Sequence, residues 1–233
     1  MAYKIRKLIT SEGSLVHSVD IAALIREDIS DGVIEFGQPL RIGQLASKYS
    51  VSVMPVREAL RQLSGEGFIV LEPNRTAKVR TLDTAYFQQI FELRMAVEIV
   101  LARGAAKNWR TSDTELVLRT HDLLEDAVKN HDFPFVLDLN RDFHRQVYSR
   151  AEHIEAYKTM DKYWLLQNAF AKRFGYNEQR FSGVVNDHWH IIKALKAGDQ
   201  DAVKIIVGAH LIKAKHFVLE NLRNESKKGS QCT

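Results

Sequence analysis

The sequence contains one cysteine, Cys232, only four prolines and no long run of apolar residues. A single cysteine cannot form a disulfide within the chain, and this composition fits a reducing compartment. Apolar stretches stay well short of the roughly 18 residues that a transmembrane helix needs. Residues 1–10 also lack the apolar segment of a secretory signal peptide. We therefore expect a cytoplasmic protein without a membrane partner.

The charge of the chain is nearly balanced, with a formal net charge of +4 over 233 residues. So small an excess does not by itself indicate a nucleic-acid partner. Its distribution is more informative, because residues 39–80 contain seven lysines and arginines against three acidic residues. This segment carries the whole excess, which suits contact with phosphates. An ordinary solvated surface would account for the charge pattern equally well.

Residues 50–63 have the pattern of a DNA-recognition helix. Val56, Leu60 and Leu63 form an apolar stripe on one side, and the other side is polar and basic. In a helix-turn-helix domain the N-terminal residues of the second helix lie nearest the bases, and arginines bind guanine or clamp phosphates. The alternative is structural, with the first arginine in a salt bridge and the second merely solvated. The predicted DNA contacts are Ser52, Val53, Met54, Pro55, Arg57 and Arg61.

The flanking segments complete a winged helix-turn-helix domain. Two further helices and a two-stranded hairpin are expected at residues 18–30, 42–48, 68–71 and 77–80. Asn74 and Arg75, at the tip of the hairpin, are predicted to reach the minor groove or the DNA backbone. Asn74 is equally suited to forming the turn itself. The domain would span residues 18–81, after a flexible arm at 1–17.

From residue 83 onward the sequence follows a helical period. Side chains suited to N-caps, and glycines suited to helix ends, divide it into six helices. Their expected bounds are 83–108, 112–130, 132–150, 154–173, 178–196 and 200–222. Short connections favour an all-α antiparallel bundle over residues 82–224, followed by a disordered tail at 225–233. The predicted fold class is mostly α: an N-terminal winged helix-turn-helix followed by an all-α antiparallel helical bundle.

A dense motif lies between positions 45 and 75. It comprises Leu45-Ala46, Val51-Ser52, Pro55-Val56-Arg57-Glu58-Ala59-Leu60-Arg61, Leu63, Glu66-Gly67-Phe68 and Pro73-Asn74-Arg75. This pattern resembles the GntR family of bacterial transcription regulators. Two positions depart from it: Val53 stands where arginine is usual, and Thr76 where the wing usually has glycine. Because that arginine is a principal base contact in the family, we expect an altered operator preference, with Val53 and Met54 meeting thymine methyl groups.

Three of the nine histidines are placed to meet in the helical part of the chain. His144 follows Asn140 by four residues, so both lie on one face of a helix. His188 and His210 lie on the last two helices, at nearly equal distances from the turn at 198–199, which brings them level in an antiparallel pair. Three imidazoles and one oxygen donor suit zinc, nickel or manganese. A histidine in a helical bundle is, however, more often an ordinary core or surface residue.

These histidines belong to a longer pattern, made of Asn140, Phe143-His144, Asp187-His188, Gly198-Asp199 and His210. The pattern resembles the FCD domain, a ligand-binding domain named for fatty-acid-responsive regulators. The resemblance implies a divalent metal held by Asn140, His144, His188 and His210, and a small carboxylate effector. Asn140 stands where aspartate is usual. A neutral amide binds a cation less strongly, so we expect weaker metal retention and stronger attraction of an anionic effector.

Arg94 matches an arginine that faces the pocket in many relatives of this kind. A guanidinium group suits a carboxylate, so the resemblance implies that Arg94 binds the effector. The alternative is an ion pair at the surface with Glu98, four residues on. Aromatic residues from 170 to 189 would either line the pocket or pack in the core.

Together these features favour a metabolite-responsive transcription regulator, and a repressor in particular. It would bind a palindromic double-stranded DNA operator as a homodimer, because two half-sites require two recognition domains. A metal-dependent hydrolytic enzyme is one rival, since a histidine-bound metal can activate water, yet the sequence has no His-Glu-x-x-His motif or phosphate loop. A ligand-independent architectural DNA-binding protein is another, but it would not need a histidine-lined pocket.

Overall fold

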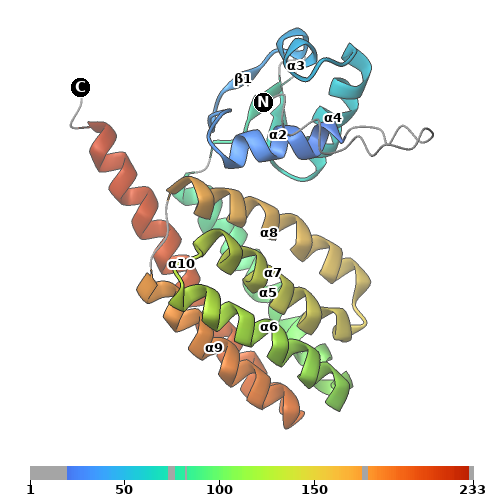
Figure 1. Ribbon diagram of the computed structural model, residues 1–233, viewed down its shortest axis with the longest axis vertical. Helices are drawn as coiled ribbons and strands as arrows, with labels where there is room; N and C mark the ends of the chain where they lie inside the picture. Colours follow the sequence, from blue (N-terminus) through green and yellow to red (C-terminus); the bar gives the residue numbers. More distant parts are fainter. Residues whose placement is uncertain (1–19, 73–76, 82, 175–177, 231–233) are drawn as a thin grey trace.

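The computed structural model describes residues 20–72, 77–81, 83–174 and 178–230. They form a small N-terminal domain seated on a helical bundle (Figure 1). The small domain has three helices and a short sheet, and the rest of the described chain is helical. The expected fold class is therefore confirmed. None of the described helices combines the length and the apolar character needed to cross a membrane.

The N-terminal domain contains α2 (Ile21–Ser30), α3 (Ile42–Tyr49) and α4 (Val53–Gly65). Asp20 caps α2 by accepting a hydrogen bond from the backbone N–H of Ala23 at 3.0 Å. The predicted apolar stripe of α4 is buried in the domain core. Its polar side is exposed. The amphipathic pattern therefore sets which side of α4 the domain presents outward.

A three-stranded antiparallel sheet completes the domain, in the order β1-β3-β2. The hairpin expected from the sequence is formed by β2 (Ile69–Leu71) and β3 (Ala77–Val79). The additional strand β1 (Pro39–Leu40) has two residues, too few for a sequence to show the alternation of a strand. Asn74 and Arg75, the predicted DNA contacts at the hairpin tip, lie outside the described residues, as does the arm at 1–17.

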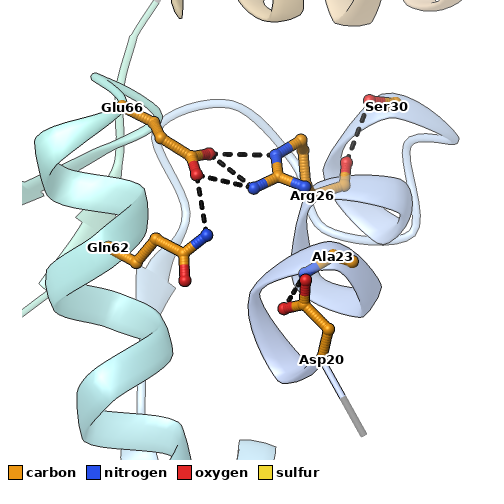
Figure 2. A network of polar contacts seen from close by, with 6 residues as sticks. All are labelled: Asp20, Ala23, Arg26, Ser30, Gln62 and Glu66. Atoms are coloured by element: carbon orange, nitrogen blue, oxygen red, sulfur yellow. Dashed lines mark hydrogen bonds and ion pairs between the residues drawn. The ribbon is translucent and has the colours of Figure 1, made fainter.

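An ion pair fixes α2 against the end of α4. The Nε and Nη2 atoms of Arg26 donate to the carboxylate of Glu66 at 2.6 to 3.0 Å, and the Gln62 amide donates to the same carboxylate at 2.9 Å (Figure 2). Such bidentate pairs hold both partners in one orientation. The pair therefore ties the C-terminal end of α4 to α2.

The bundle begins with two long helices, of which the first starts where predicted and the second starts one residue earlier than predicted. They are α5 (Thr84–Asn108), capped by Asp83, and α6 (Thr111–Lys129). The cap expected at Ser112 or Asp113 lies instead at Arg110, and Asp113 is in the first turn, where its carboxylate accepts from the backbone N–H of Arg110 at 3.0 Å. The remaining elements are α7 (Phe133–Tyr148), η1 (Ser149–Ala151), α8 (Ile154–Phe174), α9 (Glu178–Lys196) and α10 (Gln200–Ser230).

The last helix differs from the sequence expectation. α10 continues to Ser230 rather than ending near Leu222, so the segment expected to be a disordered tail is helical up to that residue. Leu219 and Leu222 are buried, and the following residues include no glycine or proline before Gly229. Nothing in that stretch stops a helix, since polar residues such as glutamate and lysine favour helical backbone.

α8 connects the two domains physically. Its residues Leu166 and Ala169 are buried in the core of the N-terminal domain, where α8 packs against α2 (Figure 1). Other residues of the same helix, Met160 and Trp164, belong to the core of the bundle. One helix therefore contributes to the cores of both domains.

Candidate functional site

All six described candidates for DNA contact lie on the exposed side of α4 or at its start. Ser52 occupies the N-cap position, and its side chain makes no capping hydrogen bond. Val53 and Met54 are 43% and 62% exposed, large values for apolar residues. Pro55, Arg57 and Arg61 are also exposed. This end of α4 therefore presents an apolar pair flanked by basic groups.

One of the two arginines has a local ion-pair partner. The Nη1 atom of Arg61 lies 3.5 Å from Glu58, and both side chains are largely exposed. Exposed pairs of this kind contribute little stability, commonly about 0–1 kcal/mol. The guanidinium can therefore leave Glu58 for a phosphate or a base at small cost.

Inside the bundle, three imidazoles converge as the spacing predicted. His144 on α7, His188 on α9 and His210 on α10 are buried, and one ligand nitrogen of each lies within 4.8 Å of the others. The Nε2 atoms of His144 and His188 are 3.2 Å apart. Two nitrogens bound at about 2.0–2.1 Å to one tetrahedral zinc would be separated by roughly 3.3 Å. The cluster has the dimensions of a metal site.

Burial keeps these rings neutral. It lowers the pKa of His144 and His188 well below their usual range, and the positive charges of neighbouring groups add to the effect. Burial also lowers the pKa of His210, although its hydrogen bond with Asp187 opposes that shift. A neutral imidazole carries a lone pair on one ring nitrogen. The three rings are thus in the protonation state that binds metal.

Asn140 lies on the same face of α7 as His144 and is also buried. Its Oδ1 atom has no hydrogen-bond partner among the described residues. A buried acceptor without a donor is costly and usually marks a place for water or an ion. The amide oxygen therefore fits the predicted role of fourth ligand.

Asp187 orients the ring of His210 from the side opposite its Nε2 atom. Its Oδ2 atom lies 3.1 Å from Nδ1 of His210, and its Oδ1 accepts from Lys213 at 2.6 Å. Burial raises the pKa of Asp187, but the bonds from His210 and Lys213 outweigh burial, so the pKa lies below its ordinary value. An ionised Asp187 holds the proton of His210 on Nδ1, which leaves Nε2 as the ligand nitrogen.

Arg94 is paired with Glu98, but not at the surface. The Nε of Arg94 donates to Glu98 at 2.7 Å, and the two side chains are 2% and 0% exposed. The hydroxyl of Tyr148 donates to the other oxygen of Glu98 at 2.6 Å. The predicted i,i+4 pair is therefore present but buried, and its guanidinium lies against the rings of Phe91 and Trp164. Burial on this scale requires a charge partner, which Glu98 supplies.

A cavity of about 50 Å³ lies beside the histidines and is lined by Arg94, Asn140, His210 and Arg180, among others. Arg180 on α9 had not been singled out from the sequence. Burial lowers its pKa, while the negative charge of Asp187 raises it. Arg180 precedes His188 by eight residues, about two helical turns, so both lie toward the same face of α9. That spacing is the sequence feature that could have identified Arg180 as a cavity residue.

Comparison with known proteins agrees with this architecture. Residues 89–213 match the FCD domain, and residues 17–79 match the family described as bacterial regulatory proteins, gntR family. The chain is 30% identical to the Nta operon transcriptional regulator of Aminobacter aminovorans, over 80% of this chain and 87% of that protein. It is 26% identical to the HTH-type transcriptional repressor RspR of Escherichia coli K12, over 82% and 84%.

The fold is also found among solved structures. E. coli McbR/YncC superposes with a TM-score of 0.74 at 18% identity, covering 89% of this chain and 99% of that one. A GntR-type regulator from Rhodococcus sp. RHA1 gives a TM-score of 0.68 at 22% identity, covering 86% and 96%. At these identities the likeness concerns the fold alone.

A winged helix-turn-helix joined to a helical domain with an internal cavity defines a DNA-binding regulator. The FCD match covers more than half of the chain, and a relative at 30% identity matches over most of its length. The chain belongs to the GntR family of bacterial transcription regulators, in the group with an FCD domain. It is a regulator of transcription and not an enzyme.

Proposed function

We propose that this regulator is a homodimeric repressor whose affinity for a palindromic operator is controlled by a small carboxylate bound at a metal site. The carrying observation is the convergence of three buried, neutral imidazoles with an amide oxygen that lacks a donor. His144, His188, His210 and Asn140 would hold the ion, and imidazole-rich sites suit zinc or nickel, with manganese as a third candidate. When bound, the metal supplies positive charge that attracts an anion.

Two features of the chain support an anionic effector. The guanidinium of Arg94 lies in the cavity wall, held by Glu98, so an entering carboxylate would meet a positioned donor. Arg180 adds a second positive group to the same wall. We therefore propose that Arg94 binds the effector and that Glu98 orients its guanidinium.

Control of DNA binding would pass through α8. Trp164 and Phe170 of this helix line the cavity, while Leu166 and Ala169 pack in the core of the DNA-binding domain. A ligand that moves the cavity wall would therefore change the pose of the DNA-binding domain. It can do so only to the extent that it binds the two poses with different affinity, typically about 1–3 kcal/mol of coupling.

The metal site is tested by metal analysis of the full chain purified without chelator and then supplemented with zinc, nickel or manganese. We expect one ion per chain, lost in His188→Ala and retained in His190→Ala. His190 is the matched control because it lies two residues away and is exposed. A metal content near zero in the supplemented wild-type protein would refute the site.

The dimer would form through an apolar face of the bundle. Leu93 and Val100 on α5 are exposed and seven residues apart, as are Ile205 and Ile212 on α10. The two helices pack against each other, so both pairs lie on the outer side of one helix pair. Exposed apolar groups at such spacing mark a surface for another protein, and an operator with two half-sites requires a second copy of this chain.

Light scattering tests this surface with two equally exposed isoleucines. We expect Ile205→Glu to give a monomer, because the charge would be buried at the interface. Ile154→Glu, on α8, should leave a dimer, since Ile154 is 67% exposed and Ile205 is 69% exposed. A monomeric wild-type protein, or dimers of unchanged strength in Ile205→Glu, would contradict the assignment.

A further inference from the structure

The cavity beside the histidines has two chemically different parts. Its charged and amide side chains lie at the histidine cluster: His210 belongs to it, the positive charges of Arg94 and Arg180 lower the pKa of His144, and Asn140 lies on the same face of α7 as His144. Apart from the indole of Trp164, the rest of its described lining is purely apolar. The larger of these apolar groups are Leu137, Trp164, Phe170, Phe181, Phe217 and Val218.

The apolar part would reject a ligand rich in hydroxyl groups. A hydroxyl moved from water into such a wall loses hydrogen bonds that nothing there replaces, whereas an apolar group is favoured. Phe170 and Phe181 already pack against other rings, with centroids 4.7 Å from Phe87 and 5.6 Å from Phe133. These aromatic walls are therefore held in place and suit a flat or branched apolar body.

We propose that the effector is a carboxylate with a compact apolar tail, aromatic or branched, rather than a polyhydroxylated acid. The proposal deepens the function proposed above and rests on it. The carboxylate lies toward Arg180, Arg94 and the histidines, and the tail lies among the aromatic residues. An effector with an apolar tail would differ from gluconate, the polyhydroxylated acid that appears in the name of one relative, the gluconate operon transcriptional repressor of Bacillus licheniformis.

The size of the cavity adds a condition. Its volume of about 50 Å³ is about a third of the roughly 150 Å³ of an engineered cavity that holds a benzene molecule. A carboxylate group fits this space, but a six-carbon tail requires a side chain to move. Phe217 on α10 is half-buried and lines the cavity, so it is the aromatic wall residue able to turn toward solvent.

The test compares anions of equal charge on the metal-supplemented full chain by titration calorimetry. We expect benzoate and cyclohexanecarboxylate to bind at least roughly tenfold more tightly than gluconate. Benzamide, which keeps the ring but lacks the charge, should bind much more weakly than benzoate. Equal or tighter binding of gluconate overturns the apolar-tail inference and leaves the metal-anchored carboxylate intact. Failure of every anion to bind overturns the proposed function itself.

Two variants test where the apolar tail and the carboxylate of the effector lie in the cavity. Phe217→Ser should reduce the preference for benzoate over gluconate, whereas Phe135→Ser, an exposed aromatic on α7 outside the cavity, should preserve it. Arg180→Gln should lower the affinity for benzoate while leaving that for benzamide unchanged. An unchanged preference in Phe217→Ser, or equal losses for benzoate and benzamide in Arg180→Gln, would contradict this placement.

Discussion

Val53 is the residue at which this regulator departs most clearly from the GntR pattern in its recognition helix. It is the first residue of α4 and is 43% exposed, next to the still more exposed Met54. Apolar groups at this point in a major groove contact the methyl group of thymine, whereas arginine pairs with guanine. The exposed position supports the expectation that this pair changes which bases are recognised.

We predict that Val53→Arg shifts the selected operator toward guanine at one symmetric position. The gain should be about 1–3 kcal/mol per half-site for the new base, as for other bidentate arginine contacts. A binding-site selection with wild-type and variant proteins measures the shift. Stability should be unchanged because the side chain is exposed, and identical selected sequences would show that Val53 does not face the bases.

Asn140 also departs from the family pattern, in which aspartate is usual at this position. Replacing it with aspartate should destabilise the protein without metal and stabilise it with metal. In Asn140→Asp a buried carboxylate faces three neutral imidazoles, so without metal the melting temperature should fall. With metal, the negative charge of the new carboxylate ligand should raise the affinity for the ion. Melting curves with and without chelator, together with chelator competition, measure both effects. A melting temperature that falls equally in both conditions would argue against Asn140 as a ligand.

At the scale of elements, α5 and η1 approach each other closely at Gly104. A Cβ atom added at Gly104 would lie 2.8 Å from the backbone oxygen of Ala151 and 3.1 Å from its Cα. Backbone atoms cannot move aside as a flexible side chain would. Glycine at this position of α5 is therefore required by packing, even though glycine weakens a helix interior.

Gly104→Ala should consequently destabilise the protein by about 1–3 kcal/mol, the usual cost of overpacking. Gly183→Ala is the matched control, because Gly183 also lies within a helix, α9, and a Cβ there meets nothing within 4 Å. That variant should be neutral or stabilising by up to about 1 kcal/mol. Urea unfolding of both proteins decides the matter, and a stable Gly104→Ala would mean that η1 is not packed as described.

The sequence predicted those elements and site residues that depend on local pattern. Caps such as Asp83 and Asp132, the amphipathic face of α4 and the meeting of His188 with His210 follow from spacing along one or two helices. The two-residue strand β1, by contrast, depends on pairing with β3. The inclusion of Arg180 in the cavity wall depends on packing among five helices, which a single sequence does not display.

Across the whole molecule, α8 is a helix that contributes buried residues to the cores of both domains. The surface between the domains is formed on one side by Leu166 and Ala169, packed with α2 and its neighbours. Trp164 and Phe170, on other positions of the same helix, line the cavity. The proposed coupling between the cavity and the DNA-binding domain needs no longer chain of contacts, because a shift of α8 at the cavity would also move the face that packs against α2.

In this arrangement, different residues of α8 contact the cavity and the DNA-binding domain. Leu166→Ala should therefore alter the effect of the effector on operator binding without altering effector binding itself. The variant removes packing between the domains, at a cost in stability of about 2–5 kcal/mol, without touching the cavity lining. We expect the affinity for the effector to be retained, while the ratio of operator affinities with and without effector moves toward one.

Leu137→Ala, which alters the cavity wall on α7, should instead weaken effector binding and preserve that ratio at saturating ligand. Measuring both affinities for both variants, below their melting temperatures, distinguishes the two roles. If Leu166→Ala left the ratio unchanged, the signal would have to reach the DNA-binding domain by another route, such as a rearrangement of the dimer.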